Sequence, residues 1–250
     1  MIDIRNVSLS HGGTRVLDDI SLTVPKGGVT ALVGPNGAGK SSLLSLIARL
    51  QPLQDGQITV DGLPVGKTPS RQLAKTLAVL RQDPAIGSRL RVGELVALGR
   101  FPHHRGRPGP EDRRIVAETL DEFDLATLAD KFVETLSGGQ RQRVLVAMTF
   151  CQGTDYVLLD EPLNNLDMYH ARQLMRYVRR VADEKTRTIV IIVHEINYAA
   201  AYADHIVAMK SGRLEAHGPT AEVLGPAMLK QVFGYEMSVL KGQSPLVAHY

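Results

Sequence analysis

The sequence predicts an α/β protein with a parallel sheet covered by helices, an N-terminal antiparallel β subdomain and an inserted α-helical subdomain. Short apolar runs that are typical of buried strands alternate with helical patterns, as in parallel sheets. The first residues instead alternate polar and apolar side chains, and a long middle stretch shows only helical spacing. We expect a single domain over residues 1–250, with a core at about 1–84 and 154–218, a helical subdomain at about 85–153 and a tail at about 219–250.

The N-terminal antiparallel pair is predicted from a period of two. Polar residues separate the apolar ones at Ile2, Ile4, Val7 and Leu9, and again at Ile20, Leu22 and Val24. Half-buried strands alternate in this way, and the glycines of His11-Gly12-Gly13 suit the turn between them. Further elements are expected as strands at Val29–Val33, Gln57–Asp61 and Leu77–Leu80, and as a helix at Ser41–Leu50.

The helical subdomain and the second half of the sheet follow in order. From Val92 to Gln152 the apolar spacing is helical, and FPHHRGRPGPED (101–112) within it is expected to be a polar loop. Strand patterns return at Tyr156–Leu159, Ile189–Val193 and Ile206–Met209, separated by helices at Met168–Glu184 and Ile196–Ala203. The tail shows a weak amphipathic pattern of apolar residues and is expected to pack on the core.

Composition narrows the class of protein. Hydrophobic residues make up 44% and charged residues 22%, the net charge is only +3, and no long basic block appears, so we expect no nucleic-acid partner. The opening MIDIRNVSLS does not resemble a signal peptide, and the longest apolar run is far too short to span a bilayer. Cys151 is the only cysteine, which rules out an internal disulfide and suits a reducing cytosol.

A phosphate-binding loop is the strongest functional pattern. Gly34 to Ser41 matches G-x-x-x-x-G-K-[ST], with a predicted strand before it and a predicted helix after it. Glycines allow backbone N–H groups to surround a phosphate, and the helix N-terminus adds positive potential. Lys40 would reach the β- and γ-phosphates, and the Ser41 hydroxyl would bind Mg²⁺. The core is therefore expected to be of the P-loop NTPase (RecA-like) type.

Two further strand ends carry polar side chains. The apolar strand at Tyr156–Leu159 ends in Asp160 and Glu161, whose charges need a cation or water beside them. Alternation sends the two carboxylates to different sides, so we expect Asp160 to hold Mg²⁺ and Glu161 to polarise the attacking water. His194 follows another strand and could contact a γ-phosphate. The alternatives are a solvated strand end and a structural histidine.

The stretch LSGGQRQR (136–143) contains a second turn with the paired glycines and hydroxyl of a phosphate-binding loop, but it has no lysine. Taken with the other motifs, nearly the whole chain resembles the ATP-binding-cassette (ABC) ATPases. The resemblance rests on the order of the phosphate loop, Gln82, LSGGQ, the acidic strand, Asn164-Asn165-Leu166-Asp167 and His194. A plain helix cap is the alternative interpretation of LSGGQ.

The resemblance implies a set of site residues and the cofactors ATP and Mg²⁺. The catalytic residues would be Glu161, His194 and Gln82, and the metal ligands Ser41, Gln82 and Asp160. Asp167 of the D-loop would support communication between two halves of a dimer. The nucleotide would contact His11, Gly34, Pro35, Asn36, Gly37, Ala38, Gly39, Lys40, Ser41 and Ser42.

The resemblance also implies that two copies pair head to tail. The signature motif of one chain would then face the γ-phosphate held by the Lys40 of the other; its residues are Leu136, Ser137, Gly138, Gly139 and Gln140. Three positions depart from the family pattern. His11 stands where an aromatic residue usually stacks on adenine, and a simple turn histidine is an equal alternative. Glu195 replaces an aspartate, and the D-loop is NNLD rather than SALD.

The segments RVGELVALGRFPHHRG and EINYAAAYADHIVAMKSGRLEAHGP resemble ATPases of bacterial ferric-siderophore, haem and cobalamin importers, and PLNNLDMYH favours the siderophore group. The implied partners are two transmembrane permease subunits, a second copy of the chain and, indirectly, a substrate-binding protein. The implied location is the cytoplasmic face of the bacterial inner membrane. The alternatives are a haem, cobalamin or metal-ion importer and a soluble non-transport cassette. We expect His103 and His104 to be surface residues rather than metal ligands.

Overall fold

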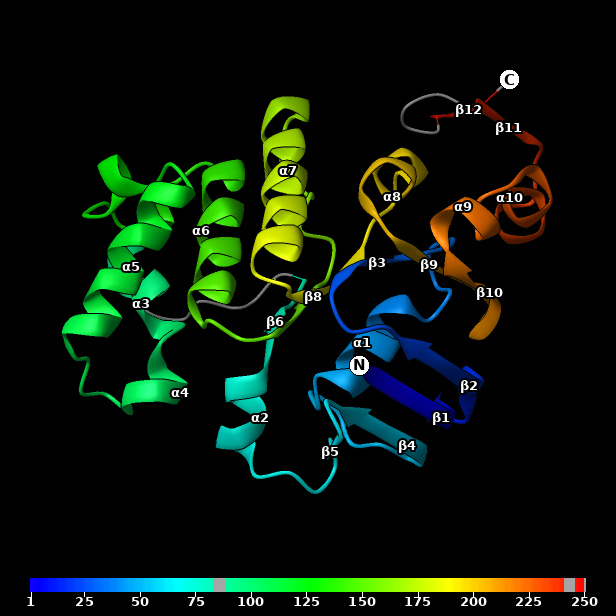
Figure 1. Cartoon of the computed structure of the whole chain (residues 1–250), viewed down its shortest axis with the longest axis horizontal. Coiled ribbons are helices and arrows are strands. Elements are labelled where there is room, and N and C mark those ends of the chain that lie inside the picture. The colour runs from blue at the N-terminus through cyan, green and yellow to red at the C-terminus, as the bar shows by residue number, and fades with distance from the viewer. Residues whose placement is uncertain (83–88, 241–245, 250) are drawn as a thin grey trace.

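A six-stranded sheet forms the centre of the molecule in the computed structural model, which describes residues 1–82, 89–240 and 246–249 (Figure 1). Its strand order is β10-β9-β3-β8-β7-β6. The five strands from β9 to β6 pair in parallel, whereas β10 pairs antiparallel with β9 at the edge. The strand bounds are β3 (Gly28–Val33), β6 (Leu77–Leu80), β7 (Tyr156–Leu159), β8 (Thr188–Ile192), β9 (His205–Lys210) and β10 (Arg213–Pro219).

A second, antiparallel sheet contains the N-terminal pair that the alternation predicts. Its order is β2-β1-β4-β5. The central strand β1 pairs Ile2 with Val24 on one side and with Val60 on the other, and these three side chains are fully or almost fully buried. The bounds are β1 (Ile2–His11), β2 (Thr14–Val24), β4 (Asp55–Val60) and β5 (Leu63–Pro64).

The parallel sheet is buried on both faces, because alternate residues of each strand enter different hydrophobic clusters. In β8, Ile189 and Ile191 belong to one cluster and Val190 and Ile192 to the other. The first cluster lies against α6, α7 and α8, and the second against α1 and the antiparallel sheet. The helix bounds are α1 (Lys40–Ile47), α6 (Gly138–Cys151), α7 (Met168–Glu184) and α8 (Ile196–Tyr202).

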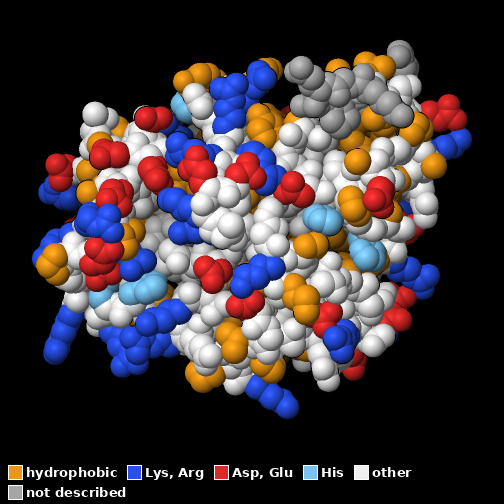
Figure 2. Space-filling view, viewed as in Figure 1, with side chains coloured by type: hydrophobic (Ala, Val, Ile, Leu, Met, Phe, Trp, Pro, Cys, Tyr) orange, Lys and Arg blue, Asp and Glu red, His pale blue; other side chains and the backbone are white. Residues whose placement is uncertain are grey.

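A group of helices lies at one end of the molecule, on the left in Figure 1. It comprises α3, α4, α5 and α6, and α3 packs against both α5 and α6. Figure 2 shows Lys and Arg side chains interspersed with Asp and Glu over this end. The remaining helix bounds are α2 (Ser70–Thr76), α3 (Val92–Leu98), α4 (Phe101–His104) and α5 (Pro110–Glu122), with 3₁₀ turns η1 (Ala126–Leu128) and η2 (Val133–Thr135).

The loop prediction for residues 101–112 is partly wrong, because the segment contains α4 and the first turn of α5. Pro102 and Pro110 stand in the first turn of these helices, where proline costs no hydrogen bond. Asp112 caps α5 by accepting from the Gly109 N–H at 3.0 Å. The buried Arg100 anchors the segment by donating to Asp112 at 3.1 Å.

The C-terminal residues pack on the core, as expected. Leu224, Leu229 and Val232 are buried in the cluster that contains α6 and α7. Asn197 of α8 holds the backbone of Val247 by accepting from its N–H at 2.7 Å and donating to its carbonyl at 3.2 Å. The elements are α9 (Thr220–Val223), α10 (Pro226–Phe233) and a hairpin of β11 (Met237–Leu240) and β12 (Leu246–His249). Among the described residues, no helix combines the length and apolar character needed to cross a membrane.

Candidate active site

Four adjacent parallel strands bring the predicted site residues to one edge of the sheet. The strands β3, β8, β7 and β6 are neighbours, and their carboxyl ends lead to the phosphate loop, His194, Asp160–Glu161 and Gln82 respectively. In open α/β sheets this edge is where ligands bind. The topology therefore gathers side chains that are far apart in the sequence.

The phosphate loop depends on glycine where its backbone passes close to other segments. Gly34 has a φ of 144°, and a Cβ there would lie 2.0 Å from the carbonyl oxygen of Met209. Gly39 has a φ of 94°, and a Cβ there would lie 2.7 Å from a methyl group of Leu17. Any other residue at these positions would push the loop away from β9 or β2.

Lys40, the first residue of α1, is buried beneath its own loop. Its Nζ donates to the carbonyl oxygens of Gly34 at 2.8 Å and Pro35 at 2.9 Å. Burial lowers the pKa of Lys40, and the nearby charges of Glu161 and Asp160 oppose that shift. The ammonium group therefore lies beside two carboxylates at the centre of the site.

Ser41 and Asp160 form an oxygen pair at the foot of the loop. The Ser41 hydroxyl donates to Asp160 Oδ1 at 2.9 Å, although the two residues lie far apart in the chain. Asp160 is buried, and this burial raises its pKa despite the hydrogen bond from Ser41. Hydroxyl and carboxylate oxygens are ligands that suit Mg²⁺. Among the described residues no group of three or more His, Cys, Asp or Glu is arranged to hold a metal ion.

Glu161 lies next to Asp160 but contacts a different set of side chains. Its Oε1 lies 2.7 Å from His194 Nε2. Its Oε2 accepts from Gln82 Nε2 at 2.8 Å and from Asn164 Nδ2 at 2.7 Å. Burial acts to raise the pKa of Glu161, but the His194 and Asn164 hydrogen bonds outweigh it and the pKa is lowered.

Asn164 contacts the Glu161 carboxylate, although the sequence did not identify it as a residue of the catalytic site. The chain reverses direction directly after β7, with Glu161 at a φ of 50°, and this turn brings Asn164 back onto the Glu161 carboxylate. The sequence offers one signal for the contact. An asparagine three residues after an acidic strand end lies within reach of that acid when the chain turns.

The signature motif caps α6 and lies next to the D-loop. The Ser137 hydroxyl accepts from the Gln140 N–H at 3.3 Å, and the Gln140 side chain accepts from the Ser137 N–H at 3.2 Å. The backbone of Gly139 approaches Asn165 so closely that an added Cβ would lie 3.1 Å from its carbonyl oxygen. No hydrogen bond joins residues 136–140 to the phosphate loop in the described part of the chain.

The remaining predicted residues lie at separate places. Asp167 caps α7 by accepting from the His170 N–H at 2.9 Å, and that bond and the His170 side chain lower its pKa. His11 is exposed at the end of β1 and lines a cavity of about 300 Å³ together with Ser41 and Ser42. His103 lies 2.8 Å from the Gln152 carbonyl oxygen.

The fold and this site define a P-loop ATPase. The family described as ABC transporter matches residues 17–164, and the chain belongs to that family. It is an ATP-binding cassette, the ATP-hydrolysing unit of such transporters.

Two relatives and one solved structure place the chain within this family. The petrobactin import ATP-binding protein YclP of Bacillus subtilis is 44% identical over 96% of this chain and 94% of its own length. The petrobactin import ATP-binding protein FatE of Bacillus anthracis is 44% identical over 100% of both chains. The dimeric post-hydrolysis structure of the cassette MJ0796 bound to ADP and Pi superposes with a TM-score of 0.80 at 26% identity, covering 88% of this chain and 99% of that one.

Proposed function

We propose that this chain is the ATP-hydrolysing subunit of a bacterial importer of ferric siderophores. One observation supports the ATPase activity in particular. Lys40, the hydrogen-bonded pair of Ser41 and Asp160, and the Glu161 carboxylate lie together at one edge of the sheet. The siderophore cargo is supported by full-length similarity to two petrobactin import proteins. Haem, cobalamin or a metal ion is the alternative cargo.

The backbone of the phosphate loop and Lys40 bind the phosphates of ATP in this proposal. The N–H groups of residues 34–42 surround the phosphates, and Lys40 exchanges its two carbonyl acceptors for β- and γ-phosphate oxygens. Ser41 and Asp160 hold Mg²⁺, with Gln82 as a further ligand. When bound, Mg²⁺ neutralises the charge that develops on the phosphates.

Glu161 acts as the general base of hydrolysis. Its lowered pKa keeps the carboxylate deprotonated at neutral pH, ready to accept a proton from water. The side chains of Gln82, Asn164 and His194 orient it. His194 also contacts the γ-phosphate. Its imidazole ring therefore lies between the Glu161 carboxylate and the phosphate that is released.

The site is completed by a second copy of the chain. In the proposed head-to-tail dimer, Ser137 and Gly139 of one copy bind the γ-phosphate on the other, and Asp167 lies between the two sites. The first turn of α6 offers N–H donors for such a contact. Met168 and Tyr169, which follow the D-loop, are 82% and 68% exposed, and large apolar side chains on a surface suit an interface.

Import also requires a pathway through the membrane. We propose that two transmembrane permease subunits provide it and hold this chain at the cytoplasmic face of the inner membrane. A substrate-binding protein delivers the cargo. The relatives described as import ATP-binding proteins support this arrangement.

Two experiments test the proposal. Glu161→Gln should abolish ATP turnover yet form an ATP-stabilised dimer in size-exclusion chromatography, and full turnover in this variant would contradict the role of Glu161. Uptake of labelled ferric siderophore, haem and cobalamin should be compared in cells with and without this gene. Loss of siderophore uptake alone is expected, whereas loss of haem or cobalamin uptake alone would favour the alternative cargo.

A further inference from the structure

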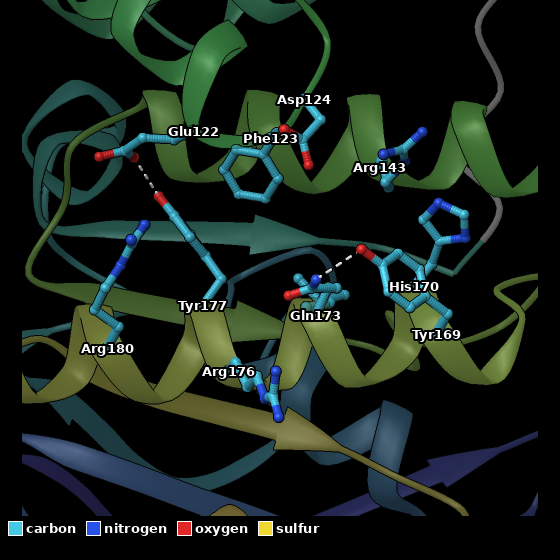
Figure 3. A pocket seen from close by; sticks show the side chains of 11 residues that line it. Glu122, Phe123, Asp124, Arg143, Tyr169, His170, Gln173, Arg176, Tyr177 and Arg180 are labelled. Carbon is cyan, nitrogen blue, oxygen red and sulfur yellow. Dashed lines mark hydrogen bonds between the residues drawn. The ribbon is translucent and has the colours of Figure 1, made fainter.

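A second pocket lies away from the ATP site, between α7, α6 and the end of α5. It encloses about 260 Å³, and none of its lining residues belongs to the phosphate loop or contacts Glu161. Figure 3 shows Arg180 and Arg143 toward opposite sides of the pocket, with Tyr177 and Gln173 between them. The pocket therefore has cationic groups on both of the helices that border it.

Three arginines line this pocket: Arg143 of α6 and Arg176 and Arg180 of α7. None of them forms an ion pair with any residue that the structure describes. Arg179, their neighbour on α7, is by contrast bridged to both Asp183 and Asp204. Arg176 and Arg180, which line the pocket, therefore carry charges that no ion pair with a described residue neutralises.

Arg143, which lines the pocket, carries an unsatisfied donor. Its Nε is buried and has no hydrogen-bond partner among the described residues. A buried donor without a partner costs free energy that a ligand oxygen would recover. Arg180 is held in place from the other side, because its guanidinium lies 5.2 Å from the centre of the Tyr177 ring.

The acidic residues of the pocket do not balance these charges. Glu122 is already committed, since it accepts from the Tyr177 hydroxyl at 2.7 Å and pairs with Lys185 at 3.5 Å. Asp124 is the other carboxylate of the lining. The lining therefore contains three guanidinium groups and one uncommitted carboxylate, and this excess of positive charge suits a ligand with two or more negative charges.

The walls indicate a small organic ligand. The Phe123 and Tyr177 rings pack 4.3 Å apart and give the pocket an apolar side, and the Gln173 amide adds a neutral polar group. Guanidinium groups bind carboxylate and phosphate oxygens in the same two-pronged geometry. We propose that this pocket is a binding site for a small organic polyanion bearing carboxylate or phosphate groups, held between α6 and α7 by Arg143, Arg176 and Arg180.

Binding can be tested without ATP hydrolysis. The background is Lys40→Ala, which removes the main cation of the phosphate loop, and the probes are citrate and pyrophosphate in isothermal titration calorimetry. At least one probe should bind with one site per chain, and the tighter one identifies the carboxylate or the phosphate class. Arg143→Gln and Arg180→Gln should each weaken binding about tenfold or more.

Arg172→Gln is the matched control, because Arg172 is exposed on the same helix and does not line this pocket. It should bind the probe as tightly as the background protein. Arg180 is also exposed, so its replacement should leave the melting temperature unchanged and keep the test valid if Arg143→Gln folds poorly. Absence of binding by both probes, or equal affinity in the pocket variants and the control, would overturn the proposal.

Discussion

Replacing Asn164 by alanine tests whether the contacts around Glu161 position the general base. The change removes one of three side-chain contacts to the Glu161 carboxylate, the 2.7 Å hydrogen bond from Asn164 Nδ2, and leaves those of His194 and Gln82. Asn164 is partly buried and lies outside the phosphate loop, so ATP binding should be preserved.

The expected loss follows from the orientation of the base. Without this bond only Gln82 and His194 hold the Glu161 carboxylate, and its misplacement is expected to lower kcat by roughly tenfold or more. The same bond lowers the pKa of Glu161, and its loss raises that pKa. Because the base acts only when deprotonated, the acid limb of the kcat profile should move to higher pH. The loss of activity should therefore be greatest at acid pH.

The assay is steady-state ATP hydrolysis from below the ordinary pKa of glutamate up to about pH 9, with the KM for ATP measured at each pH. Gln142→Ala is the matched control, because the Gln142 amide donates to the carbonyl of Pro162 in the same turn and does not contact Glu161. We expect the acid limb of the kcat profile to shift in the Asn164→Ala variant and to stay unchanged in the Gln142→Ala control. An Asn164→Ala profile that coincides with the wild type would refute the positioning role.

Three further changes give separate outcomes. Ser137→Arg should leave ATP binding to the phosphate loop intact, measured by fluorescent-nucleotide titration, while hydrolysis is lost; surviving hydrolysis would contradict the contact in trans. Phe150→Ala should lower the free energy of unfolding by about 3–5 kcal/mol in urea titrations, because the ring is only 4% exposed and packs on Phe123 and Tyr177. A change below about 1 kcal/mol would show that the core refills the space. Gly34→Ala should abolish ATP binding, because its Cβ would lie 2.0 Å from the Met209 carbonyl oxygen; a variant that binds ATP normally would show that the loop can shift.

Much of the candidate site follows from the sequence, because its residues stand directly after apolar strands. The runs before Gly34, Asp160 and His194 are short and fully buried, and parallel strands bring their ends together. The opening alternation likewise gives the β1–β2 pair, since each apolar residue of the pattern becomes buried.

Other features depend on contacts between distant residues and have no local pattern. The edge strand β10 contains Gly218 and Pro219 and few apolar residues, and it forms through backbone pairing with β9. The short helix α4 is held by residues distant in the sequence, because Arg71 donates to the Pro102 carbonyl at 3.2 Å. The Asn164–Glu161 contact is local, but it depends on the positive φ of Glu161, which the sequence does not specify.

Mixing two inactive variants tests the shared site most directly. In a head-to-tail dimer, one Ser137→Arg chain and one Lys40→Ala chain form one site with an intact Lys40 and an intact Ser137, whereas no single chain has both. We expect ATP hydrolysis to reappear on mixing, at roughly a quarter of the wild-type rate, since about half of the dimers are mixed and each has one intact site. A mixture as inactive as its two components would contradict the shared site.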